Sequence, residues 1–239
     1  FSSRRRHTRQ GHVTGVQTCA LPIFSTRALA GAFQLRVDTL ESGVWLNDGH
    51  AHFTFRPLPF RAQLAPSLGL EALDLDGDGL PELCLSQNFL GPNPEAGRMD
   101  GGMGLILRSL GNGSFESVDP GRGGYVVAGD GRGVGRLDLG GDGFADLVVA
   151  VHGAGLRSFE NTTPKVNPGV VPFAVRLRGR AGNPLAVGAR VEVRHQDGFR
   201  QVAEVRAGGG GVSDSGATLY MAHKRERMPS RRSEEHTSE

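Results

Sequence analysis

The stretch Asp74-Leu75-Asp76-Gly77-Asp78-Gly79-Leu80-Pro81-Glu82-Leu83 alternates acidic residues with apolar residues and glycines. Hard cations such as Ca2+ bind carboxylate and carbonyl oxygens, and a loop with acids at alternate positions supplies several of them at once. Glycine suits places where the chain bends tightly around an ion, because residues with a Cβ adopt such conformations poorly. The sequence therefore predicts a loop that holds a cation through Asp74, Asp76, Asp78, the Leu80 carbonyl and Glu82.

Two other interpretations of this stretch have to be weighed against a cation site. An Asp/Gly-rich turn between two strands, with its acids solvated, has the same composition. An EF-hand also begins with alternating acids, but its loop ends in a later bidentate Glu and lies between helices. Glu82 comes too early for that role, and no helical pattern flanks the loop. The EF-hand is therefore excluded, whereas the plain turn stays open as the alternative.

A second, degraded copy of the loop begins at Asp138. The stretch Asp138-Leu-Gly-Gly-Asp-Gly-Phe-Ala-Asp-Leu aligns with the first at an offset of 64 residues, and an apolar run follows each copy. Gly140 replaces the second acid, while Asp138, Asp142 and Asp146 remain. Because Ca2+ affinity depends on the number of charged ligands, this copy is either a weaker metal site or only a turn.

Nearly the same offset relates two segments that precede the loops. Residues 45–53 and 109–115 each contain an Asn/Asp-Gly turn followed by Phe, so each repeated unit runs from such a turn to an acidic loop and a buried strand. A unit of this kind cannot bury both faces of its small sheet alone and has to stack on neighbours, as propeller blades do. About two units are visible, whereas closed propellers contain about four to eight blades. We therefore expect the chain to be a fragment of a longer protein.

Both ends of the sequence differ from its middle. Residues 1–23 include SSRRRHTR and residues 231–239 read RRSEEHTSE; both resemble peptides that arise when sequencing-adapter DNA is translated in frame with an environmental gene fragment. Without these ends, 21 of the 27 basic and 22 of the 25 acidic residues remain, and the net charge is −1 instead of +2. The corrected charge gives no support for nucleic-acid binding. We expect residues 1–23 to be disordered and foreign to the fold.

The composition of the whole chain indicates its fold class. Thirty-seven glycines, a charged fraction of 22% and few windows with helical periodicity predict an all-β fold of short strands and tight turns. Cys84 stands alone in an apolar run, so we expect a small core residue and no disulfide framework. No stretch approaches the roughly 20 apolar residues that a membrane span requires.

The C-terminal part of the chain has a different pattern. Residues 163–172 are rich in proline and predict a linker between two domains. Beyond it, apolar and polar residues alternate in segments 173–179, 189–195 and 199–206. This period of two is typical of antiparallel strands with one buried face. We expect a small β-rich domain over residues 173–223 and, because the pattern stops near His223, a foreign tail over residues 224–239.

The residues of the first part carry a family resemblance. The acidic loop, the run Leu83-Cys-Leu-Ser after it and the element Asn47-Asp-Gly-x-x-x-Phe resemble the FG-GAP/VCBS repeats of integrin-type β-propellers. The resemblance implies about two propeller blades within residues 24–162. It also implies that the acids matching Asp74, Asp76, Asp78 and Glu82 coordinate Ca2+ in a loop between two strands.

The C-terminal segment resembles the start of an ASPIC/UnbV domain. The matching stretches are 182–183, 188–193, 201–206, 208–213 and 219–222. This domain is small and β-rich and follows FG-GAP/VCBS blades, so the order of the two resemblances strengthens both. Together they are typical of the cartilage-acidic-protein-like group and imply a truncated ASPIC/UnbV domain over residues 173–223, with no catalytic residues.

The sequence contains no motif of a catalytic nucleophile, a zinc protease or a pair of metal-binding cysteines. We therefore expect a non-enzymatic, Ca2+-binding module that binds a protein or a glycan, with no nucleic-acid partner. It is expected to be extracellular or periplasmic, with its signal peptide outside this sequence, and monomeric in the full-length protein. The alternative is an accessory propeller domain of a carbohydrate-active enzyme whose catalytic part lies upstream. The ligand is not predicted, because propellers serve many unrelated functions.

Overall fold

The computed structural model describes residues 33, 36–91, 97–209 and 213–230. The chain divides into two compact units, Phe1–Glu41 and Ser42–Glu239. The described residues of the first unit, 33 and 36–41, form no helix or strand. The predicted foreign head, residues 1–23, and residues 231–239 of the predicted tail lie outside the described residues.

The regular secondary structure of the second unit consists almost entirely of strands. These are β1 (Gly43–Asn47), β2 (Phe53–Pro57), β3 (Ser67–Leu73), β4 (Glu82–Gln87), β5 (Leu105–Ser109), β6 (Phe115–Ser117), β7 (Asp130–Leu137), β8 (Asp146–His152), β9 (Gly155–Phe159), β10 (Val170–Val175), β11 (Arg190–Arg194), β12 (Arg200–Glu204) and β13 (Leu219–Lys224). The helices of the described part are single turns: η1 (Phe60–Gln63), α4 (Pro120–Gly123) and α5 (Thr163–Val166). The predicted all-β class is confirmed. Within the described residues, no helix has the length and apolar character needed to cross a membrane.

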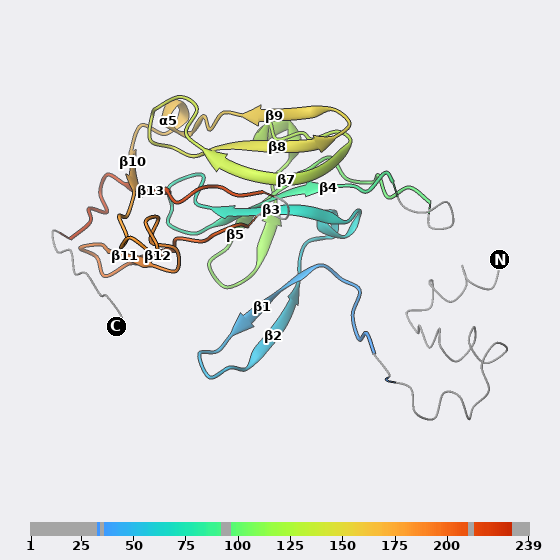
Figure 1. Ribbon diagram of the computed structural model, residues 1–239, viewed down its shortest axis with the longest axis horizontal. Helices are drawn as coiled ribbons and strands as arrows, with labels where there is room; N and C mark the ends of the chain where they lie inside the picture. Colours follow the sequence, from blue (N-terminus) through green and yellow to red (C-terminus); the bar gives the residue numbers. More distant parts are fainter. Residues whose placement is uncertain (1–32, 34–35, 92–96, 210–212, 231–239) are drawn as a thin grey trace. The chain divides into compact units, whose positions relative to one another are not determined.

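Two antiparallel meanders form the centre of this unit. One sheet has the strand order β3-β4-β5-β6, and the other has the order β7-β8-β9. Strand β7 lies against β3 and β4, so the three-stranded sheet stacks on the four-stranded one (Figure 1). Each acidic loop therefore joins the first and second strands of its own sheet.

Strand β4 is buried along its whole length because it has a core on each face. On one face, Leu83 and Leu85 pack with Leu105 and Leu107 of β5. On the other face, Cys84 packs in a cluster that contains core residues of β7 and β8. Cys84 is fully buried and is a free thiol, which confirms the predicted core cysteine.

The boundary between the two sheets does not coincide with the boundary between the two repeated units predicted from the sequence. In the sequence, the Asn-Gly turn of residues 109–115 stands at the start of the second unit. In the structure, the hairpin that contains this turn, β5–β6, pairs with the preceding strand β4 and completes the first sheet. The pairing of Leu83 with Leu107 and of Leu85 with Leu105 explains the difference, because it joins apolar residues on one face of the sheet.

A buried ion pair joins the two sheets. Arg136 of β7 binds Glu71 of β3, and Ser215 Oγ donates a hydrogen bond to the second carboxylate oxygen of Glu71 at 2.6 Å. Glu71 is buried, so the guanidinium compensates a carboxylate that has lost much of its water. One acidic side chain thereby connects β3, β7 and the segment before β13.

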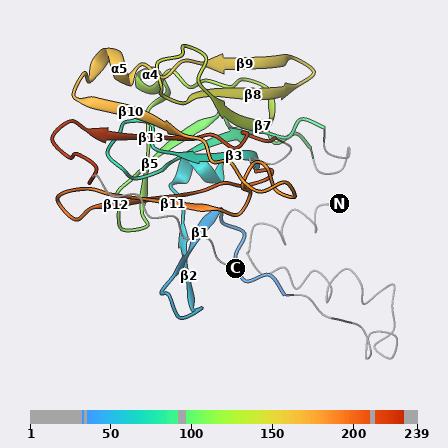
Figure 2. The ribbon, with the colours of Figure 1, turned by 60° about the vertical axis from the view of Figure 1, so that its left-hand side comes forward.

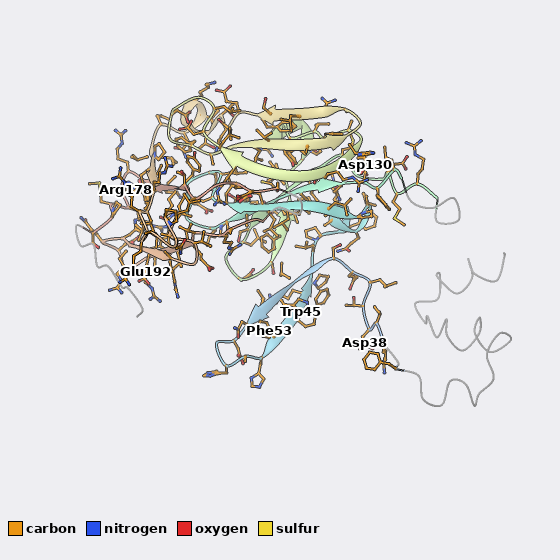
Figure 3. All side chains as sticks on the ribbon, in the orientation of Figure 1. Asp38, Trp45, Phe53, Asp130, Arg178 and Glu192 are labelled. Carbon is orange, nitrogen blue, oxygen red and sulfur yellow. The ribbon has the colours of Figure 1, made fainter. Side chains whose placement is uncertain are left out.

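The hairpin β1–β2 has one packed face and one exposed face. Val44 packs against the core around Leu83 and Leu107. Trp45 and Phe53 lie on the opposite face and are 62% and 56% exposed (Figure 3). The Trp45 ring contacts Phe55, with ring centroids 5.1 Å apart.

The C-terminal strands form two further pairs, β10 with β13 and β11 with β12 (Figure 2). The predicted linker, residues 163–172, contains α5 and the first residues of β10, so part of it is regular structure. Residues 224–230, assigned from sequence to the foreign tail, include the last residue of β13 and hydrogen-bond the end of β11 and the turn after it. Ser230 N donates to the Arg194 carbonyl at 2.7 Å, and Gln196 N donates to the Met228 carbonyl at 3.0 Å.

Candidate metal site

The first acidic loop joins the end of β3 to the start of β4, and at this end of the two strands Leu73 lies opposite Glu82. Leu73 and Leu83 are buried at its two ends, which anchors the loop in the core as the sequence predicts. Gly77 and Gly79 have φ angles of 75° and 91°. Because a side chain is strained at such positive angles, these two positions favour glycine and explain the spacing of the loop.

Backbone N–H groups of the loop hold its aspartates in place. Asp74 accepts hydrogen bonds from Gly77 N at 2.8 Å and from Gly79 N at 2.9 Å, one on each carboxylate oxygen. Asp76 Oδ1 accepts from Asp78 N at 3.1 Å, and Asp78 Oδ1 accepts from Leu80 N at 2.7 Å. The loop is therefore ordered by its own backbone, and the described residues show no hydrogen bond to Oδ2 of Asp76 or of Asp78.

The three aspartates converge on one point. Asp74, Asp76 and Asp78 each offer a carboxylate oxygen, and these atoms lie within 4.8 Å of one another. All three residues are partly buried. Three like charges at this separation repel one another, and a divalent cation is the partner that would neutralise them with oxygen ligands. This arrangement fits the predicted ligand set.

Glu82 supplies a second indication of a cation. It is 3% exposed, and its Oε2 accepts a hydrogen bond from Leu75 N at 2.8 Å. Its other oxygen, Oε1, is buried without a hydrogen-bond partner among the described residues. Burial, together with the charges of Asp76, Asp74 and Asp78, raises the pKa of Glu82 from 4.5 to about 8, against the opposite effect of the Leu75 N–H group. A buried carboxylate oxygen without a partner is costly unless a ligand reaches it.

The pKa of Asp74 is perturbed in the same direction. Burial raises it from 3.8 to about 7, against the opposite effect of the N–H groups of Gly77 and Gly79. Burial also raises the pKa of Asp76, and the charge of Asp78 adds to this. The raised values mean that the protein alone stabilises the negative charge of this cluster poorly. Clusters of perturbed carboxylates are typical of binding sites.

Leu80, whose carbonyl was predicted as a ligand, lies in the same loop and bonds Asp78 Oδ1 through its N–H. The role of its carbonyl stays a prediction. Glu82 is not among the three residues whose oxygens converge within 4.8 Å, but its pKa responds to all three. The structure therefore brings three predicted ligands together and places the fourth acid beside them.

The second loop repeats this backbone arrangement at the offset of 64 residues. Asp138 accepts hydrogen bonds from Gly141 N at 2.6 Å and Gly143 N at 2.9 Å, and Asp142 Oδ1 accepts from Phe144 N at 3.0 Å. The strand register also matches, because Leu137 lies opposite Asp146 as Leu73 lies opposite Glu82. Each hairpin also has a shift in its strand register at the equivalent place. The shift lies between Ser67 and Gly69 in the first hairpin and between Gly131 and Gly133 in the second.

The carboxylates of the second loop do not converge in the same way. The described residues contain no second group of three acids as close as that of the first loop, so Asp138, Asp142 and Asp146 stay a predicted weaker site. Asp146 is buried like Glu82, yet both of its oxygens are bonded. Leu139 N donates to Oδ2 at 2.7 Å, and Asn161 N donates to Oδ1 at 2.7 Å. The protein itself satisfies this acid.

Several residues near the first loop have no signal in the sequence. Gln201 of β12 donates to Asp74 Oδ2 at 3.4 Å, and Arg227 donates to the Asp78 carbonyl at 3.3 Å. Val170 lies so close to Gly77 that a Cβ there would be 2.2 Å from it. In the sequence, Gln201 is an ordinary residue of an alternating strand, and its partner is 127 positions away. Only the tertiary contacts reveal these neighbours.

No protein-family model matches the chain, and a search of curated proteins finds no match.

Proposed function

We propose that this chain is a non-catalytic, Ca2+-binding module whose cation is held by Asp74, Asp76, Asp78 and Glu82. One observation carries the proposal: three convergent carboxylates lie beside a buried fourth whose Oε1 has no partner in the described part of the chain. Ca2+ takes six to eight oxygen ligands, more than four acids provide singly, so water and the Leu80 carbonyl complete the set.

The cation has a structural role in this proposal. It neutralises the acids of a loop that joins the first two strands of a sheet, so it ties β3 to β4 at the edge of the core. The four-stranded meander and the sheet stacked on it support blades of an FG-GAP/VCBS-type propeller, followed by an ASPIC/UnbV-type segment. An extracellular or periplasmic location suits a loop with this ligand set, because extracellular Ca2+ modules have dissociation constants of roughly 0.1–1 mM.

Calorimetric titration of the purified chain with Ca2+ tests this proposal. At a free Ca2+ concentration of about 100 times Kd, binding to the folded state alone stabilises by about 2.7 kcal/mol, which corresponds to a rise in Tm of roughly 5–10 °C. Asp78→Ala should remove both the heat of binding and the rise in Tm. If the folded chain showed neither at 10 mM Ca2+, a concentration of about ten times the weakest expected Kd, the proposal would be wrong.

A further inference from the structure

We propose that Gln201 is a positioning residue for this cation site, and that cation binding at the first loop is coupled to the docking of the C-terminal strands on that loop. The inference rests on the proposed function, because the same carboxylates bind the cation. It assigns a regulatory role to residues that lie more than a hundred positions away in the sequence.

Gln201 adds a third donor to the first ligand, Asp74, from outside the loop. It is 6% exposed, and its Nε2 donates to Asp74 Oδ2 at 3.4 Å and to the Ala222 carbonyl at 2.8 Å. Both partners accept hydrogen bonds, so the amide nitrogen has to face Asp74. Asp74 Oδ2 then has two donors, Gln201 and Gly79 N, whereas Oδ1 accepts from Gly77 N. A lone pair of Oδ1 is thereby left for the cation.

A chain of contacts leads from Gln201 back to the loop. One ring nitrogen of His195 lies 3.0 Å from Gln201 Oε1, and the other lies 3.0 Å from the Arg227 carbonyl. Arg227 Nη1 donates to the Asp78 carbonyl at 3.3 Å. The contacts therefore start at one predicted ligand, Asp74, and end at another, Asp78. His195 is 4% exposed, so this circuit runs mainly through the interior.

An aromatic ring completes the contact with the loop. The Arg227 guanidinium lies over the Phe199 ring, 4.3 Å from its centroid. A Cβ on Gly79 would lie 2.4 Å from the same ring, so Phe199 packs directly on the backbone of this glycine. We call Gln201, His195, Arg227 and Phe199 the clamp. It touches the loop at Asp74, Asp78 and Gly79.

Coupling follows from the position of the clamp. Residues that hydrogen-bond a metal ligand hold it in its binding orientation, and their loss typically weakens metal affinity about 10- to 100-fold. Linkage is reciprocal: if the docked clamp favours cation binding, the bound cation favours the docked clamp by the same factor. The cation therefore holds the C-terminal strands on the first sheet as well as joining β3 to β4.

Calorimetric titration of the full chain with Ca2+ tests the role of Gln201. Gln201→Met keeps the volume of the side chain but removes the donor to Asp74, and we expect Kd to rise about tenfold or more. Gln63→Met is the matched control. Gln63 also makes three hydrogen bonds, to Ser42 O, Leu58 O and Ser42 N, but on the side of β1 and β2. This control should lower Tm and leave Kd unchanged.

Hydrogen exchange measures the reciprocal effect, which a merely structural role of Gln201 would not produce. In the wild type, Ca2+ should slow amide exchange in β12, and in Gln201→Met this protection should fall at the same Ca2+ concentration. If Gln201→Met does not fold, Arg227→Lys replaces it, because lysine loses the planar group that stacks on Phe199 and reaches Asp78. We expect this variant to weaken Kd several-fold.

The outcomes separate the two proposals. A wild type that binds no Ca2+ would contradict the proposed function. A wild type that binds Ca2+, with folded clamp variants that bind it equally well, would overturn the positioning role and leave the proposed function intact. Ca2+-dependent protection of β12 that is the same in the wild type and the variants would also overturn it.

Discussion

The two acidic loops share one backbone design and differ in the surroundings of their carboxylates. In each, the first aspartate accepts N–H groups of two glycines, and both glycines have positive φ angles. Gly140 stands in the second loop where the first has Asp76. Buried Asp146 has both oxygens hydrogen-bonded, whereas Oε1 of the equivalent Glu82 lacks a partner among the described residues.

The difference separates what a turn needs from what a cation needs. The second loop forms the same turn with only its first aspartate, its glycines and one buried acid whose oxygens are both hydrogen-bonded. The additional carboxylate of the first loop contributes repulsion and raised pKa values, which destabilise the fold unless a ligand compensates. The second loop is therefore an internal control for the first.

The largest effect is expected where the two hairpins are joined. Arg136→Met leaves the buried carboxylate of Glu71 without its cationic partner and should lower the free energy of unfolding by about 3–5 kcal/mol. Chemical denaturation measures it. The double variant Glu71→Leu/Arg136→Met should recover most of the loss, because no unpaired charge remains. If Arg136→Met were as stable as the wild type, the ion pair of Arg136 with Glu71 would not be what holds the two sheets together.

Asp76→Gly gives the first loop the residue that the second has at this position. We expect Kd for Ca2+ to rise about 100-fold, because the site loses one of its converging carboxylates. The fold should persist, since the second loop forms the same turn with Gly140. Calorimetry measures Kd, and the circular dichroism spectrum serves as the control for folding. Unchanged affinity would show that Asp76 does not account for the expected difference in Ca2+ binding between the two loops.

The effect of Ca2+ on Tm should depend on pH in the first loop. The pKa values of Asp74 and Glu82, about 7 and about 8, lie above their ordinary values of 3.8 and 4.5. Without a cation, the stability linked to these groups is fully present below about pH 4 and is lost as the pH rises through about 8.

Bound Ca2+ compensates the ionised carboxylates, so the rise in Tm should be roughly 5–10 °C at pH 8.5 and almost absent at pH 5. Thermal unfolding at both pH values, with and without Ca2+, measures this dependence. Asp76→Gly serves as the control and should show little rise at either pH. An equal rise in the wild type at pH 5 and pH 8.5 would contradict the raised pKa values.

The smallest effect is expected from adding the missing acid to the second loop. A Cβ at Gly140 would lie 3.9 Å from Asp142 Cγ, which is ordinary contact, and Gly140 does not have the positive φ of its neighbour Gly141. Gly140→Asp should therefore fold and add weak Ca2+ binding, with Kd of about 1 mM or higher. The stoichiometry in calorimetry should rise from one towards two. A stoichiometry that stays at one would contradict this prediction. It would mean that the second loop binds no Ca2+ even with the added acid, as expected if the hydrogen bond from Asn161 N makes a cation at Asp146 unnecessary.

The sequence predicted the local features of both loops and less of what surrounds them. The glycines, the alternating acids and the strands on either side follow from residue type and spacing, which act over a few positions. Strands β11 and β12 lie within the predicted alternating segments for the same reason. The pairing of β4 with β5 was not predicted, because the turn of residues 109–115 was assigned to the next unit.

The sequence by itself determined that this chain is β-rich, that it turns twice through acidic glycine loops, and that only the first keeps alternating acids throughout. The tertiary structure decided which acids are satisfied. Asn161 comes to Asp146 from 15 positions away, and Gln201 and Arg227 come to the first loop from 127 and 149. Burial and hydrogen bonding at such separations depend on how sheets stack, which no local pattern records. For that reason the acids and the poorer ligand set of the second loop could be identified from sequence, but the hydrogen bonds that satisfy Asp146 and not Glu82 Oε1 could not.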